Sequence, residues 1–170
     1  MRVARSTLPL VALLAGIGLP APCQIQSPNP TSYSNYELLV YHAFFTRAQW
    51  LQSQAGRLDA KGESGSFLRS TIMREAGLTA AEAASLNAVA ADWSTGDLAV
   101  SNAAKALVAS GTAHYSPGLQ GLAAQRKQVV ADHVDQLKTA FGPTRFAVLN
   151  AYAHRNTGGL APPATAAGGR

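Results

Sequence analysis

Apolar side chains recur every three or four residues through most of this chain. In residues 37–58, Leu38, Tyr41, Phe45 and Ala48 share one face, and this spacing is typical of an amphipathic helix. Similar helical patterns occupy residues 67–76, 80–110, 119–141 and 144–154. No segment alternates apolar and polar residues as a strand does. The pattern predicts an all-α fold, an irregular helical bundle or a set of helical hairpins with four to six helices and no sheet.

Two short motifs predict where helices start. Ser34 is followed by Glu37, and Thr79 by Glu82. In this capping-box spacing, each side chain accepts a hydrogen bond from a backbone amide that the first helical turn leaves unpaired. Gly77 lies just before the second motif and can adopt the left-handed conformation that ends a helix. One helix is therefore expected to stop at Gly77 and the next to start at Thr79.

Other glycines predict loops and interruptions. Residues 59–66 and 111–118 contain glycine beside polar or charged residues and are expected to be loops. Gly96 costs about 1 kcal/mol relative to alanine inside a helix, so a kink or a division into two helices is expected there. Gly142 should end the helix before it, and Pro143 is well suited to open the last one.

The start of the chain resembles a secretory signal peptide. Arg2 and Arg5 precede an apolar run over residues 8–19, a layout typical of such peptides. The run falls short of the roughly 20 residues that a membrane-spanning helix needs, so no stable span is expected in the mature form and a periplasmic or secreted location is predicted. The expected organisation is a signal peptide at residues 1–23, an extended lead-in at 24–33, a helical domain at 34–155 and a disordered tail at 156–170.

Cys23 is the only cysteine of the chain. Lipoprotein anchoring at Cys23 is an alternative to simple cleavage, but it requires small residues just before the cysteine, and Pro20 and Pro22 fit that requirement poorly. Cleavage after Cys23 would leave a mature chain with no disulfide and no cysteine-based metal site.

The charges do not indicate a nucleic-acid partner. The formal net charge is +5, and removing Arg2 and Arg5 from the 14 basic side chains leaves 12 against 9 acidic ones. These charges are scattered along the chain and form no basic stripe of the kind that binds nucleic acid.

No group of residues in the sequence predicts a catalytic site, a metal site or a cofactor. Ser64 lies in the sequence Gly-Glu-Ser-Gly, which lacks the spacing of a nucleophile elbow. No two histidines are spaced as a ligand pair on one helical face. The histidines are His42, His114, His133 and His154. Two alternatives stay open: a secreted hydrolase that places His133 or His42 with two carboxylates in one cleft, and a periplasmic metal-responsive protein that uses His42, His114 or His133.

The first predicted helix is unusually rich in aromatic residues. Core packing accounts for most of them, since aromatic side chains dominate cores by buried area. The remaining interpretation is an exposed apolar surface for a partner, a client protein or a second copy of the chain. The candidates for this surface are Tyr36, Tyr41, Phe44, Phe45 and Trp50.

Two segments resemble secreted bacterial helical proteins. Leu78 and Thr79 match the Leu-Thr-x-x-Gln element of the Spy-like periplasmic chaperones, with Glu82 in place of the glutamine. Residues 141–153 are similar to the C-terminal ending of uncharacterised secreted helical proteins from environmental bacteria. The Spy-like resemblance implies a concave helical cradle, usually dimeric, that shields unfolded clients.

These observations together favour a non-enzymatic function. The prediction is an exported helical protein that binds proteins or peptides through an apolar groove, in a chaperone-like or interaction role, with a homodimer as one arrangement.

Overall fold

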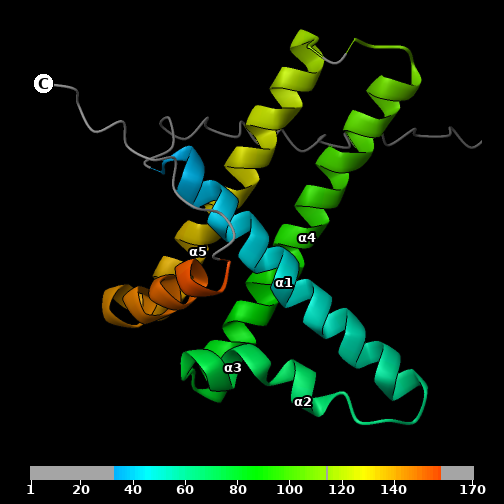
Figure 1. Ribbon diagram of the computed structural model, residues 1–170. Helices are drawn as coiled ribbons and strands as arrows, with labels where there is room; N and C mark the ends of the chain where they lie inside the picture. The colour runs from blue at the N-terminus through cyan, green and yellow to red at the C-terminus, as the bar shows by residue number, and fades with distance from the viewer. Residues whose placement is uncertain (1–32, 114, 158–170) are drawn as a thin grey trace, which may run out of the picture.

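The computed structural model describes residues 33–113 and 115–157. The predictions of a signal peptide, of the lead-in up to residue 32 and of a disordered tail beyond residue 157 lie outside these residues. The predicted start of that tail at residue 156 is wrong, because Asn156 is the last residue of a helix. The described chain contains helices and no strand, which confirms the all-α prediction (Figure 1). The helices are α1 (Asn35–Ala60), α2 (Ser66–Arg69), α3 (Thr71–Ala76), α4 (Ala80–Ala109) and α5 (Pro117–Asn156).

Both predicted capping boxes are present. The Glu37 amide donates to Ser34 Oγ at 3.2 Å, and the Ser34 amide donates to Glu37 Oε2 at 2.8 Å. The same pair of bonds, again 3.2 and 2.8 Å long, joins Thr79 and Glu82 at the start of α4. Gly77 ends α3 in the left-handed conformation, with φ 63°. The predicted stop and start are therefore confirmed.

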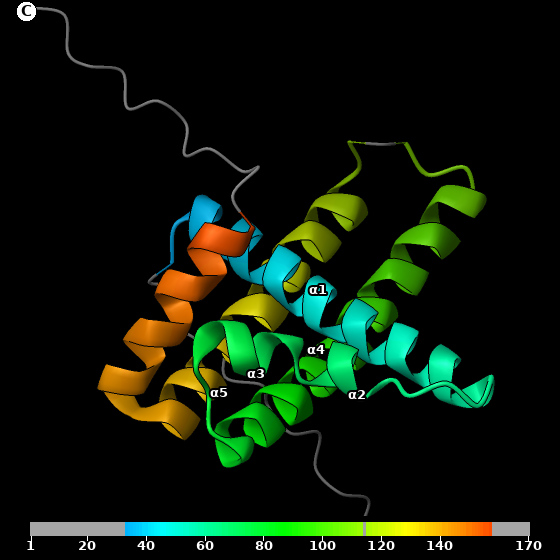
Figure 2. The ribbon, with the colours of Figure 1, turned by 60° about the horizontal axis from the view of Figure 1, so that its bottom comes forward.

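Helix α1 lies across α4 and α5, which run side by side in opposite directions (Figure 1). At Gly142 the backbone leaves the helical conformation, with φ 66° and ψ 167°, so α5 bends there. The segment 143–156 then returns beside the start of α1 (Figure 2). Tyr41 donates a 2.7 Å hydrogen bond to Asn150 across this contact. The predicted helix end at Gly142 is confirmed. The bend at this residue directs segment 143–156 back toward α1, where the two pack together.

The prediction of a kink at Gly96 is wrong. Helix α4 continues through this residue without interruption. A Cβ atom at position 96 would lie 3.1 Å from Cγ1 of Val129 on α5. The glycine therefore allows α4 and α5 to approach closely, and tertiary packing outweighs its low helix propensity.

The predicted helix over residues 67–76 is divided in two. Ser70 ends α2 and precedes α3. The loop before α2 packs so closely on α1 that a Cβ at Gly65 would lie 2.7 Å from Cα of Ala55. A side chain at position 65 would therefore force the loop and α1 apart.

The far ends of α4 and α5 form a projecting hairpin arm, defined as residues 101–129 (Figure 1). Among the described residues of this arm, none is buried. Val100 and Val130, at its base, are both buried. The hydrophobic core therefore ends where the arm begins.

A bidentate ion pair fixes the last segment of α5 to the start of α4. Arg145 donates from Nε to Glu82 Oε1 at 2.6 Å and from Nη2 to Oε2 at 2.8 Å. It also donates to the Gly77 carbonyl at 2.8 Å. Arg145, together with the Thr79 amide, lowers the pKa of Glu82 to about 2. The side chain that caps α4 thus also fastens the last helical segment.

No helix in the part of the chain that the structure describes is both long and apolar enough to span a bilayer.

Candidate functional site

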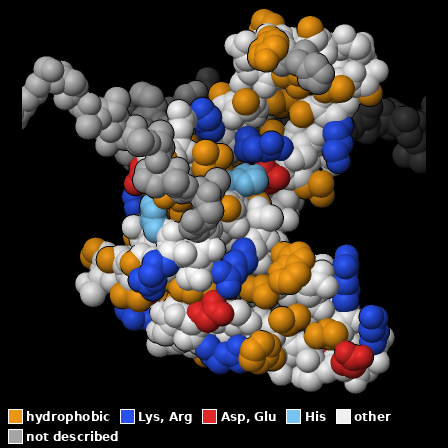
Figure 3. Space-filling view, viewed as in Figure 1, with side chains coloured by type: hydrophobic (Ala, Val, Ile, Leu, Met, Phe, Trp, Pro, Cys, Tyr) orange, Lys and Arg blue, Asp and Glu red, His pale blue; other side chains and the backbone are white. Residues whose placement is uncertain are grey.

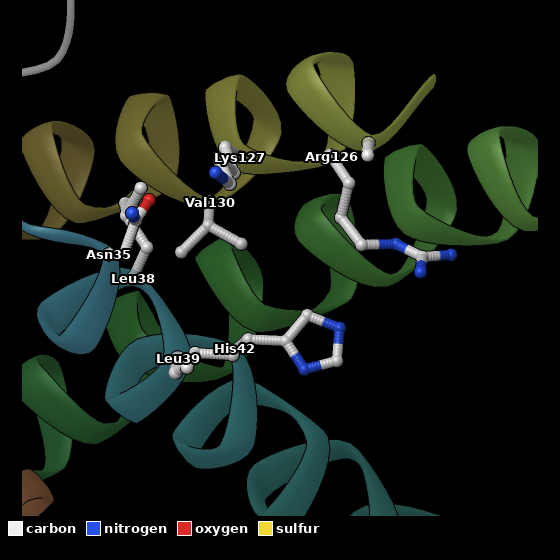
Figure 4. A pocket seen from close by; sticks show the side chains of 8 residues that line it. Asn35, Leu38, Leu39, His42, Arg126, Lys127 and Val130 are labelled. Atoms are coloured by element: carbon white, nitrogen blue, oxygen red, sulfur yellow. The ribbon is translucent and has the colours of Figure 1, made fainter. Parts of the chain in front are cut away.

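A groove of about 370 Å³ lies where α1 crosses the base of the hairpin arm (Figure 4). Its residues occupy one face of each helix, at spacings of one, three or four positions. Helix α1 contributes Asn35, Leu38, Leu39 and His42, and α5 contributes Ala123, Arg126, Lys127 and Val130.

The wall of the groove is mainly apolar. Leu38 and Val130 are buried and continue the hydrophobic core to the surface, whereas Leu39 is 56% exposed. Leu39 and Ala123 are the exposed apolar residues of this wall, and apolar side chains gathered in one hollow are typical of a binding surface. The groove therefore offers apolar contacts that the described chain itself leaves uncovered.

A polar cluster borders the groove. Arg126 Nε lies 2.8 Å from Asp97 Oδ1, and His42 Nε2 lies 3.5 Å from the same oxygen. Arg126 also donates from Nη2 to Ser101 Oγ at 2.6 Å. These contacts hold the guanidinium of Arg126 against α4 at the border of the groove.

Positive charge is concentrated around this opening. Lys127 is exposed and forms no ion pair with any other described residue. Lys and Arg side chains gather where the arm meets the body of the protein (Figure 3). Among the residues that the structure describes, no carboxylate lines the groove itself. An acidic group on a ligand would therefore be attracted to this end of the groove.

A second recess adjoins the groove on the α4 side. It is lined by residues of α1 and α4 that include Trp93, Asp97 and Leu98. Trp93 is 4% exposed, and its indole N–H has no hydrogen-bond partner among the described residues. The His42 ring packs edge-on against Trp93 at 5.2 Å. His42 lines the groove and Asp97 lines the recess, so this pair lies between the two hollows.

None of the aromatic candidates predicted from the sequence lines the groove. Tyr41, Phe44 and Phe45 are buried, so their prediction as surface residues is corrected. They pack on one another and on the last segment of α5, because α1 is covered by helices over a wide arc. Tyr36 is half-buried and packs against the core. Trp50 is exposed, but it lies in a separate recess.

The aromatic candidates predicted from the sequence lie on α1, which also forms one wall of the groove, but on other faces of that helix. Of the α1 residues in the groove, His42 is the only functional candidate that the sequence suggests, for metal binding or hydrolysis. Leu39 could have been recognised from its position, because it follows the core residue Leu38 and falls outside the narrow apolar face of the predicted helix.

His42 and His133 each meet one carboxylate. His133 Nε2 lies 3.1 Å from Asp92 Oδ2, and its Nδ1 lies 2.6 Å from the Val129 carbonyl oxygen. Because a carbonyl only accepts, Nδ1 carries a proton in this contact. Among the described residues there is no group of three or more His, Cys, Asp or Glu side chains that could hold a metal ion. The hydrolase alternative needs two carboxylates beside one histidine, and neither His42 nor His133 has them in its described ion pairs.

Comparisons with protein-family models, curated proteins and solved structures find no match for this chain. The functional interpretation is therefore based on the geometry of the groove.

Proposed function

We propose that this chain is an exported, non-enzymatic helical protein that binds a protein or peptide segment in the groove between α1 and α5. The observation that carries the proposal is the exposed apolar side chain of Leu39 in a groove that has the cation Lys127 at its edge. The apolar wall supplies affinity through burial, and Lys127 selects for acidic residues beside the bound apolar side chains.

The size of the groove suits a short anchor rather than a whole domain. A volume of about 370 Å³ accommodates a few side chains, and partners commonly insert one or two apolar anchors into such hollows. The expected ligand is therefore an exposed segment of an unfolded or flexible protein with apolar residues next to Asp or Glu. The resemblance of residues 78–82 to Spy-like chaperones is consistent with a client of this kind.

The test uses an unfolded acidic client. Reduced α-lactalbumin aggregates in solution, and light scattering follows the aggregation. We expect the purified mature chain to slow the rise in scattering at stoichiometric ratios. Replacing Leu39 with glutamine removes the apolar contact while keeping the size of the side chain, so Leu39→Gln should abolish most of this effect.

Leu98→Gln is the matched control. Leu98 is 57% exposed, almost the same as Leu39, but it lies in the adjoining recess and not in the groove. Leu98→Gln should suppress aggregation as the parent does. Equal activity of the parent and Leu39→Gln would contradict the proposal, as would the absence of any effect of the parent.

A second copy of the chain is the other occupant to consider. Sedimentation of the parent and of Leu39→Gln tests it directly. A dimer that dissociates in the variant, together with no effect on the client, would show that the groove serves self-association.

A further inference from the structure

Another recess lies at the far end of α1, away from the groove. It measures about 500 Å³ and shares no residue with the groove. Its walls come from the last turns of α1 and from Leu68 of α2. The α1 residues that matter for its chemistry are Trp50, Gln54, Arg57 and Lys61.

These α1 residues form a line along one face of the helix and its C-terminal cap. They follow one another at steps of four, three and four positions, a spacing that keeps side chains on the same face. At a rise of 1.5 Å per residue, Trp50 and Arg57 are about 10 Å apart along the axis, and Arg57 and Lys61 about 6 Å. An aromatic ring, an amide and two cations are therefore presented in sequence to one ligand.

The aromatic ring is accessible. Trp50 is 56% exposed although tryptophan is among the largest apolar side chains. Leu58 and Leu68 continue the apolar part of the wall. An exposed indole at the edge of a recess offers an apolar face on which another ring can pack.

The charge of the recess is uncompensated. Arg57 and Lys61 form no ion pair with other described residues, and no carboxylate lines the recess. The nearby Asp59 is paired with Arg69, which lowers the pKa of its carboxyl group. The two cations are thus free to bind an anionic group of a ligand.

We propose that this recess binds an acidic oligosaccharide. The indole of Trp50 stacks on the face of one sugar ring, Gln54 hydrogen-bonds to hydroxyl groups, and Arg57 and Lys61 bind the carboxylate or sulfate of a neighbouring ring. The volume falls within the range of small-molecule sites, roughly 300 to 1,000 Å³, and is much larger than a single inorganic anion needs. A neutral sugar would leave both cations without a partner.

Other ligands fit the recess less well. A purely apolar peptide would leave the amide and both cations without partners. Stacking and charge together therefore favour a ligand in which sugar rings, each with an apolar C–H face, carry anionic groups.

Tryptophan fluorescence gives the first readout. The chain has two tryptophans, and Trp93 is buried, so quenching by acrylamide reports mainly on Trp50. Tetragalacturonate, a sulfated tetrasaccharide and neutral maltotetraose are titrated into the mature chain. We expect saturable protection of Trp50 by one or both acidic sugars, weakened by salt, and no protection by maltotetraose. The acidic sugar that saturates identifies the preferred anionic group.

Calorimetry with that sugar then tests the residues. Trp50→Ala and the double variant Arg57→Gln, Lys61→Gln should each weaken binding at least tenfold. Tyr115→Ala removes a fully exposed aromatic ring elsewhere, and the double variant Lys105→Gln, Arg155→Gln removes the same charge elsewhere. Both controls should bind within twofold of the parent, and far-UV circular dichroism should be unchanged in all four.

Several outcomes would overturn this assignment. They are an absence of saturable protection, equal binding of maltotetraose, an equal loss in the charge control, and binding only to phosphatidylglycerol vesicles. Leu39→Gln should leave sugar binding intact, so failure here is distinguishable from failure of the groove proposal.

Discussion

Replacing Gly142 with alanine tests the bend in α5. At φ 66° and ψ 167°, this residue occupies a region of backbone conformation that is essentially restricted to glycine. A Cβ atom at this position would meet nothing within 4 Å. The cost of the substitution is therefore backbone strain alone, on the order of 1–3 kcal/mol. Loss of chain entropy in the unfolded state offsets about 0.4–1 kcal/mol of it.

Gly121→Ala is the matched control within the same helix. Gly121 has a helical conformation in the exposed part of α5, and an added Cβ again meets nothing within 4 Å. Alanine should therefore stabilise this position by about 0.5–1 kcal/mol. The same substitution is thus expected to have opposite effects at the two sites.

Thermal unfolding followed by circular dichroism at 222 nm measures both variants. For a domain of this size, 1 kcal/mol corresponds to a shift of roughly 4 °C in the melting temperature. Gly142→Ala should melt several degrees below the parent and Gly121→Ala a few degrees above it. If both variants melt above the parent, position 142 is helical, and the return of residues 143–156 to the start of α1 is wrong.

Three further predictions concern the core, the ion pair at the start of α4 and the loop before α2. Leu137 is 0% exposed, so Leu137→Ala should lower the free energy of unfolding in urea by about 2–5 kcal/mol. Leu98 is exposed, so Leu98→Ala should change that free energy by less than about 0.5 kcal/mol. Equal effects of the two substitutions would contradict the packing of α5. The pKa of Glu82 is lowered from 4.5 to about 2, so its ion pair stabilises the fold above about pH 4.5 and loses this effect as the pH falls toward 2. The difference in melting temperature between the parent and Glu82→Gln should therefore shrink over that range, and a constant difference would contradict the pairing. Gly65→Ala should lower the urea midpoint, because the new methyl group meets the backbone of Ala55, and an unchanged midpoint would refute that contact.

Helix ends could be predicted from the sequence because they depend on neighbouring residues. The capping boxes at Ser34 and Thr79 and the stop at Gly77 each involve side chains and amides within a few positions. The exception was Gly96, where a contact with Val129 from another helix decides the outcome. Local propensity predicted a break there, and packing between helices removed it.

The candidate site could not be predicted in the same way. Leu39 and Lys127 are far apart in the sequence, and the groove between them exists only because α1 crosses α5. Periodicity identifies the apolar face of a helix but not the helix that covers it. Phe44 and Phe45 of α1 illustrate this limit of periodicity. Their side chains point in different directions on the helix, yet both are buried.

The separation of the hairpin arm from the hydrophobic core also has a consequence for local unfolding. Because none of its described residues is buried, residues 101–129 are held by fewer apolar contacts than the rest of α4 and α5. Segments of this kind open at a lower free energy than the core does. Amide hydrogens of the arm should therefore exchange with solvent earlier than those of residues 130–141. Ala123 and Lys127 belong to both the arm and the groove. Each local unfolding of the arm therefore also removes one wall of the groove. A ligand bound in the groove would slow amide hydrogen exchange throughout the arm.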